Sequence, residues 1–162
     1  MAFRTHLLVV ANQTVDSPDL IDALAGRAER GPISATLLVP AAWSEREAAT
    51  SRMEQAIAAL RERGVEADGM IGDGDPIVAV QEAWNPGRFD EVVVSTLPAG
   101  SSRWMTTGLP SRVAKLTDCT TTHVEARPER DAAPREPSPP PARRPLLESA
   151  LSLMRTETRR PE

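Results

Sequence analysis

Residues 91–110 have the sequence EVVVSTLPAGSSRWMTTGLP, in which an apolar run gives way to a loop of small hydroxyl and glycine residues. A short continuous apolar run is typical of a strand buried on both faces of a parallel sheet. Where such a strand ends, backbone N–H groups point outward, and the start of the next helix favours an anion. The stretch therefore predicts an α/β protein with a ligand site after residue 96.

The rest of the chain repeats this alternation of strand and helix. Four further segments have strand character, at residues 7–11, 35–39, 65–71 and 120–124. The segments between them place apolar residues at helical spacing, so the strands are expected to be parallel and their crossovers right-handed. Residues 65–71 and 120–124 are poorer in branched apolar side chains, which indicates edge strands. The pattern predicts a three-layer, doubly wound sheet of five parallel strands with helices on both faces.

Three helix starts are marked by capping residues. Ser17 precedes a proline and an acid, which is typical of an N-cap. Ser44 and Glu47 have the spacing of a capping box. Asp75 precedes Pro76, so we interpret residues 72–75 as a helix cap rather than a metal or phosphate loop. The last helix is expected at residues 110–116.

The composition is that of one soluble domain. The chain has 162 residues, of which 40% are apolar and 26% charged, and we assign residues 1–126 to the domain. A net charge of -4 argues against a nucleic-acid partner. The single cysteine, Cys119, allows no internal disulfide, and no apolar run is long enough for a signal peptide or a bilayer span. We therefore expect a cytoplasmic protein with no membrane contact.

The composition changes after residue 126. Residues 127–145 are rich in proline and arginine, which predicts a disordered linker because such a segment buries too little apolar surface. Residues 146–158 have apolar residues on one face and predict a short amphipathic helix. One hypothesis is that this tail docks on a protein partner.

The candidate ligand site lies where two loops are expected to meet. With the strand order 3-2-1-4-5, the loop after the first strand and the loop after the fourth strand flank the point at which the winding reverses. Two interpretations stay open for each polar residue there. A hydroxyl either holds a phosphate or bonds to the backbone of its own loop. Asn12 either faces a ligand or caps a turn, and Arg103 either pairs with an anion or is solvated. The candidates are Asn12, Thr14, Ser95, Thr96, Gly100, Ser101, Ser102 and Arg103.

No set of residues points to catalysis or to a metal. The two histidines and Cys119 lack the spacing of a zinc site or of a nucleophile with its base. No pair of acids is placed for general acid–base work. We expect no catalytic residues, no metal ligands and no enzymatic activity.

The strand pattern, the length and the loop leading to Gly108 resemble the universal stress protein family over residues 5–125. The resemblance implies a Rossmann-like fold of the adenine nucleotide alpha hydrolase type, a stress-associated role and a homodimer through the fifth strand. Members that bind ATP carry a motif of three spaced glycines followed by serine or threonine. Its positions fall here on Ser95, Pro98, Gly108 and Leu109, of which only Gly108 matches. The resemblance also implies that Val39 flanks the adenine.

These departures predict a degenerate nucleotide site. Proline at 98 removes a backbone donor, and leucine at 109 removes a hydroxyl that would bond a phosphate oxygen. The first interpretation is thus a non-catalytic module of the universal stress type. Two alternatives stay open: a binder of ATP or another adenine nucleotide whose anion site is rebuilt from residues 100–103, and a scaffold whose tail docks on a partner.

Overall fold

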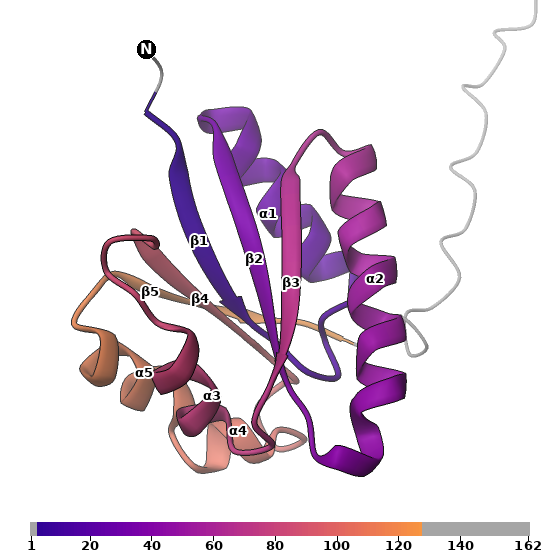
Figure 1. The fold of residues 1–162 in the computed structure, drawn as a ribbon, viewed down its shortest axis with the longest axis vertical. Coiled ribbons are helices and arrows are strands. Elements are labelled where there is room, and N and C mark those ends of the chain that lie inside the picture. The colour runs from indigo at the N-terminus through magenta and orange to yellow at the C-terminus, as the bar shows by residue number, and fades with distance from the viewer. Residues whose placement is uncertain (1–2, 128–162) are drawn as a thin grey trace, which may run out of the picture.

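The computed structural model describes residues 3–127 (Figure 1). The linker after Arg127 and the helix expected at residues 146–158 lie outside the described residues. The elements in chain order are β1 (Thr5–Val10), α1 (Pro18–Arg30), β2 (Ile33–Pro40), the 3₁₀ turn η1 (Trp43–Glu45), α2 (Arg46–Glu62), β3 (Glu66–Gly72), α3 (Pro76–Ala83), β4 (Glu91–Thr96), α4 (Arg103–Thr106), α5 (Leu109–Thr117) and β5 (Thr121–Glu125).

The five strands form one parallel sheet in the order β3-β2-β1-β4-β5, which confirms the predicted topology. Every neighbouring pair is parallel, and β1 pairs with both β2 and β4 at the centre. The strands predicted from apolar runs agree with the observed strands to within two residues at each end. The edge positions expected for β3 and β5 are also confirmed.

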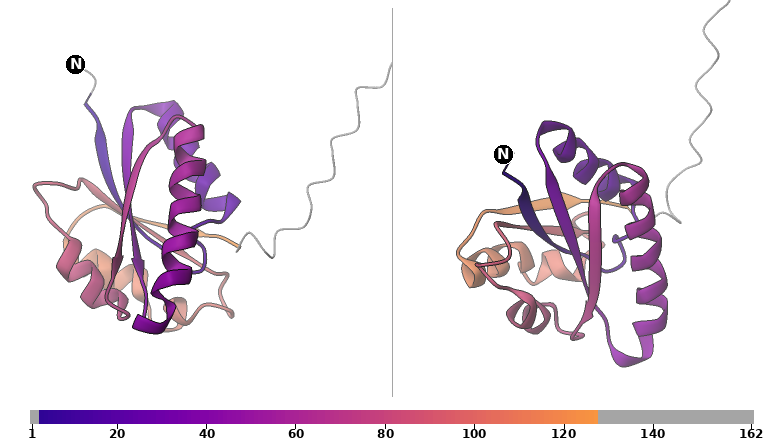
Figure 2. Two further views of the ribbon diagram at one scale, coloured as in Figure 1. Left: turned by 45° about the vertical axis from the view of Figure 1, so that its right-hand side comes forward. Right: turned by 45° about the horizontal axis from the view of Figure 1, so that its top comes forward.

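The helices form a layer on each side of the sheet (Figure 2). Helices α1 and α2 cover one face, and α3, α4 and α5 cover the other. The alternation of side chains along β1 divides the core between the two layers, because Leu7 and Val9 pack toward α1 and α2 whereas Leu8 and Val10 pack toward α3 and α5. All four side chains are buried.

Two of the predicted helix caps are confirmed. The Ser17 hydroxyl accepts a hydrogen bond from the Asp19 amide at the start of α1, at 3.2 Å. Asp75 accepts from the amide of Ile77 at 2.8 Å and caps α3. These side chains satisfy amide groups that the first turn of a helix leaves without a carbonyl partner.

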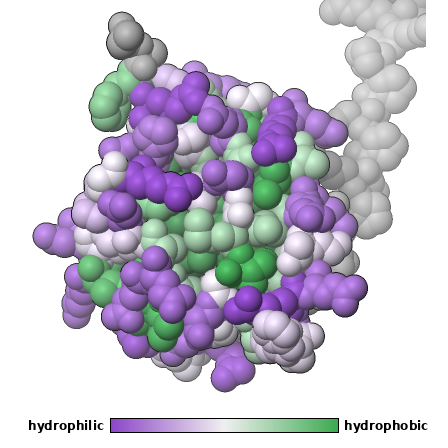
Figure 3. Space-filling view, in the orientation of Figure 1, coloured by the Kyte–Doolittle hydropathy of each residue, from purple (hydrophilic) through white to green (hydrophobic). Residues whose placement is uncertain are grey.

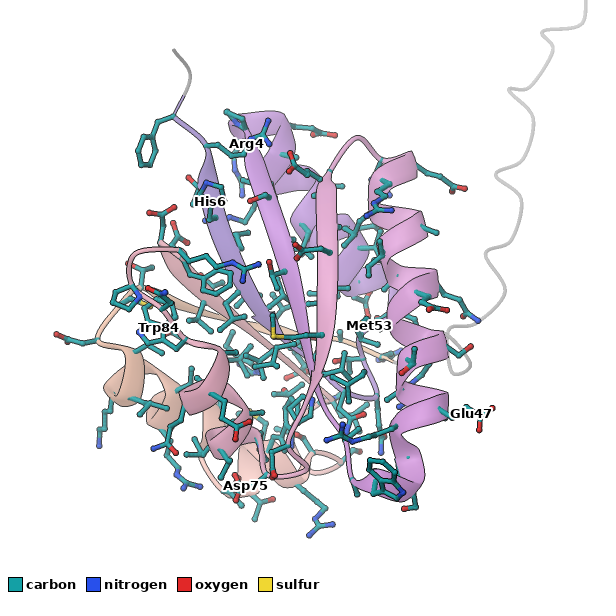
Figure 4. The ribbon with its side chains drawn as sticks, viewed as in Figure 1. Arg4, His6, Glu47, Met53, Asp75 and Trp84 are labelled. Atoms are coloured by element: carbon teal, nitrogen blue, oxygen red, sulfur yellow. The ribbon has the colours of Figure 1, made fainter. Side chains whose placement is uncertain are left out.

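The capping box predicted from Ser44 and Glu47 is wrong. Ser44 lies inside η1, so its backbone is not in the extended conformation that an N-cap residue adopts. Glu45 precedes α2 without a side-chain hydrogen bond to the helix. Glu47 is exposed and points away from the helix into solvent (Figure 4). The short 3₁₀ turn replaces the cap at this helix start.

Because the strands are parallel, their carboxyl ends all lie at the same end of the sheet, which we call the carboxyl edge. Asp75 follows β3 at this edge, whereas Arg4 and His6 lie at the opposite edge, where β1 begins (Figure 4). After β5 the chain stays at the carboxyl edge, because the Arg127 amide donates to the Asp19 carboxylate at the start of α1, at 3.0 Å.

Strand β3 is only partly covered. Met70 and Ile71 are half-buried. Apolar side chains reach the surface in the middle of the view, where β2 and β3 lie, and polar side chains surround them (Figure 3). At the end of the strand Gly72 lets α3 approach closely, since a Cβ atom there would lie 2.7 Å from the Ala79 Cβ and 3.0 Å from the Leu38 Cδ1.

We predict that Gly72→Ala destabilises the fold by ~1–3 kcal/mol, because the added methyl group overpacks the contact between β3 and α3. The matched control is Gly26→Ala within α1, where an added Cβ meets no atom within 4 Å. This control is expected to stabilise the fold by ~0.5–1 kcal/mol, since alanine favours a helix. Urea unfolding followed by circular dichroism measures both. Equal effects of the two substitutions would contradict the prediction.

Candidate functional site

The loop after β1 meets the end of β4, where the sequence places the reversal of winding. A hydrogen bond of 2.8 Å joins the Thr14 hydroxyl, after β1, to the Ser95 hydroxyl, near the end of β4. Both residues are buried, at 2% and 1% exposure. The contact brings together residues 81 positions apart in the chain, next to the paired strands β1 and β4.

Two further candidate hydroxyls also have partners inside the protein. Thr96 Oγ1 donates to the Leu97 carbonyl oxygen at 2.9 Å and lies 2.7 Å from His123 Nε2, on β5. The Ser102 hydroxyl accepts from the Met105 amide and caps α4. Thr96 and Ser102 are buried. In this arrangement both hydroxyls hold the loop and the strand ends in place, which is the structural role weighed for them.

Only part of the predicted phosphate loop is open to solvent. Gly100, Ser101 and Arg103 are exposed at the carboxyl edge. Gly100 has a φ of +94°, a left-handed conformation that favours glycine. The loop is closed by a turn in which the Ser101 amide donates to the Pro98 carbonyl at 3.0 Å. These three residues remain accessible to an anion.

Three residues named by the family resemblance lie close to or within the core. Gly108 has a φ of +65° and precedes α5. Leu109, at the position of the family hydroxyl, is fully buried against the α3 and α5 side of the sheet. Val39 is fully buried against α1 and α2. The structure thus gives Leu109 and Val39 packing roles.

Asn12 has a partner that the sequence analysis missed. The Arg52 guanidinium, from α2, donates through Nη2 to Asn12 Oδ1 at 3.2 Å. On α2, Arg52 lies between the buried residues Ala49 and Met53. A charged residue next to the buried face of a helix is the sequence feature that could have indicated this contact. The distance to Asn12 depends on how α2 packs across the sheet, which the sequence does not specify.

A second arginine, Arg46, lies at the first position of α2. Its guanidinium carbon is 5.5 Å from the ring centre of Trp43, a residue that is 86% exposed. The Nε atoms of Arg46 and Arg52 are both buried, and neither has a hydrogen-bond acceptor within residues 3–127. Helix α2 therefore brings two positive charges to the carboxyl edge.

Two hollows of the surface lie away from this edge. One, of about 540 Å³, is lined by residues at the start of the strands, including Phe3 and Thr120. The other, of about 350 Å³, lies between α1 and the strands β4 and β5, beside Leu24 and Val124. Neither includes a candidate site residue.

Across residues 3–127, no three histidine, cysteine or acidic side chains lie together as a metal site would require. In the same range, no helix is long and apolar enough to cross a bilayer.

The known proteins most informative for this chain are solved structures. One is a universal stress protein in complex with cAMP, with a TM-score of 0.55, 16% identity, and coverage of 78% of this chain and 100% of that one. Another, from Archaeoglobus fulgidus, has a TM-score of 0.55, 10% identity, and coverage of 75% and 93%. A third, from the same organism and in complex with dAMP, has a TM-score of 0.50, 11% identity, and coverage of 77% and 100%.

These likenesses establish the fold, which is the Rossmann-like α/β fold of universal stress proteins. No protein-family model matches the chain, and no curated protein is similar to it in sequence. The fold that the resemblance implied is thereby confirmed.

We predict that the bond between Thr14 and Ser95 stabilises the two loops. Thr14→Val and Ser95→Ala are each expected to cost ~1–2 kcal/mol of unfolding free energy, because each leaves a buried hydroxyl without its partner. The double variant should cost less than the sum of the two, with a coupling of ~0.5–1.5 kcal/mol. Chemical denaturation measures the cycle, and Ser101→Ala, at an exposed hydroxyl, is the control. Additive effects would show that the two hydroxyls act independently.

Proposed function

We propose that this chain is a non-catalytic module of the universal stress type whose degenerate nucleotide site binds a triphosphate only weakly. The observation that supports the proposal is that Ser95 and Thr96, at the end of β4, and Ser102, in the loop that follows, are buried and bonded inside the protein. The resemblance implies that members of the family hold phosphates at this loop. Pro98 adds to this, because it has no backbone N–H to donate.

The expected loss of affinity is large. A hydrogen bond to a charged group contributes about 1.5–3 kcal/mol, so losing the donors at positions 98 and 109 costs several kcal/mol of triphosphate binding. The exposed residues Gly100, Ser101 and Arg103 offer fewer donors to a phosphate in place of those that are lost. The proposal is therefore a binding or signalling role, stress-associated and cytoplasmic, without turnover of a nucleotide.

The second candidate function is that of an adenine-nucleotide binder with a diverged phosphate loop. It is favoured by the fold likeness to two proteins whose structures hold cAMP and dAMP. Each of those ligands carries one phosphate, which needs fewer donors than a triphosphate does. The two candidates differ in whether an adenine nucleotide binds with micromolar affinity.

We also propose a homodimer through the outer edge of β5. Two hydrogen bonds between β4 and β5 show which backbone groups of β5 face β4. The Val92 amide donates to the Thr120 carbonyl, and the Ala126 amide donates to the Thr96 carbonyl. The even-numbered residues of β5 therefore face β4. The alternation of a parallel strand then leaves the backbone groups of Thr121, His123 and Glu125 facing outward. An edge of this kind can pair with the same edge of a second copy across a two-fold axis.

For the dimer, we predict a particle of twice the chain mass at micromolar concentration. His123→Pro should yield monomers, because it removes an outward N–H at the centre of β5. His123→Ala is the matched control, since it loses the same side chain but keeps the N–H, and it should remain dimeric. Size-exclusion chromatography with light scattering decides the question, and a monomeric wild-type chain would refute the dimer.

For the nucleotide site, we predict that ATP binds with millimolar affinity at best and no more than about threefold tighter than AMP, because the loop offers the phosphates few donors. Isothermal titration calorimetry with ATP, ADP, AMP and cAMP measures the affinities. Micromolar binding of any of the four nucleotides that is weakened by Arg103→Ala would overturn the proposal in favour of the second candidate.

A further inference from the structure

We infer that Arg52 and Asn12 form an anion site, in which the guanidinium of Arg52 binds the phosphate group of a small ligand at the carboxyl edge. This inference goes beyond the proposed function, because it places the charge on α2, away from the loop after β4. It rests on the position of Arg52, on its unpaired charge and on the neutral residue that it contacts.

The position is set by the strands. The Ala11 amide donates to the Leu38 carbonyl at 3.1 Å, so the chain after β1 stays beside the end of β2. Asn12 follows directly, and Thr14 is bonded to Ser95 two residues later. Arg52 thus reaches from the helix layer to the end of the central strand, close to where β1 and β4 send their loops to opposite faces.

The charge of Arg52 has no counterion within residues 3–127. Two other arginines of the α1 and α2 layer are paired with acids, Arg27 with Glu91 at 2.6 Å and Arg63 with Asp22 at 2.8 Å. Among the described residues, the side chain of Arg52 makes one hydrogen bond, to the neutral amide of Asn12, and its Nε is buried without an acceptor. A buried donor of a charged group that lacks an acceptor is costly, so an anion that supplied one would stabilise Arg52.

The chemistry of residue 12 keeps this charge available. An amide oxygen accepts a hydrogen bond from Arg52 but does not neutralise it, and the contact of 3.2 Å is at the long end of the usual range. Nη2–H and the buried Nε–H lie on one side of the guanidinium, and this is the pair with which arginine binds two phosphate oxygens once the side chains around Nε move aside. An aspartate at this position would form an ion pair and compete with the ligand.

A second cation stands at the same edge. Arg46 begins α2, and its guanidinium lies over the exposed ring of Trp43. Like that of Arg52, its Nε is buried without an acceptor among the described residues. Arg46 is flanked by Glu45 and Glu47, so its charge is balanced locally and Arg52 carries the inference.

The test uses AMP and inorganic phosphate as probes, with chemical-shift titration for binding and thermal unfolding without ligand for stability. Arg52→Gln should weaken binding about 10- to 100-fold, as expected for the loss of a charged donor pair. Asn12→Asp should weaken binding to a similar extent, yet raise the melting temperature by about 1–4 °C, because the new ion pair stabilises the free protein. The control is Arg30→Gln, which removes one positive charge at the opposite edge of the sheet and should change neither probe's affinity.

The opposite signs expected for Asn12→Asp separate this inference from a general loss of fold. Wild-type binding of either probe that depends on Arg52 supports the site, and a preference for AMP over phosphate identifies the ligand as a nucleotide. The inference is overturned if Asn12→Asp binds as the wild type does, if Arg52→Gln binds unchanged, or if the wild-type chain binds neither probe up to about 10 mM. The last result leaves the proposed degenerate module standing, whereas tight ATP binding through Arg103 refutes that proposal without deciding the role of Arg52.

Discussion

The structure depends on the burial of β1 on both of its faces. Its residues from Leu7 to Val10 are almost fully inaccessible, with alternate side chains in the two helix layers. A strand buried in this way lies inside the sheet and not at its edge, and here β1 pairs with both β2 and β4. Right-handed crossovers then place the helices on its two sides on opposite faces of the sheet. The two cores and the meeting of chain segments at the carboxyl edge follow from this central position.

At the meeting point, the same polar side chains serve either a ligand or the fold. The bonds of Thr14 with Ser95 and of Thr96 with His123 tie the ends of β1, β4 and β5 together. These hydroxyls are buried and bonded inside the protein, while Leu109 adds its side chain to the core. Under the proposed function, stability and phosphate binding compete for these few positions. Arg52, on the neighbouring helix, lies outside that competition.

The sequence predicted what local patterns determine. Apolar runs located the strands, Ser17 and Asp75 marked two helix starts, and the polar character of residues 65–71 and 120–124 indicated the two edge strands. The pattern at Ser44 and Glu47 failed, because a 3₁₀ turn of three residues can replace a side-chain cap without a strong sequence signal. The contact of Arg52 with Asn12 spans 40 residues and depends on the packing of α2. Single hydroxyls, too, could not be assigned to a ligand or to the backbone before their neighbours were known.

The hydrogen bond between Arg127 and Asp19 has a practical consequence for labelling the molecule. It directs the chain after β5 past the start of α1, so a fluorophore or surface anchor joined at Arg127 would crowd the carboxyl edge, where we place the proposed anion site. Phe3, which is 81% exposed, precedes β1 at the far end of the sheet. With six residues in β1, that end lies roughly 20 Å away, so a probe attached there leaves the carboxyl edge clear.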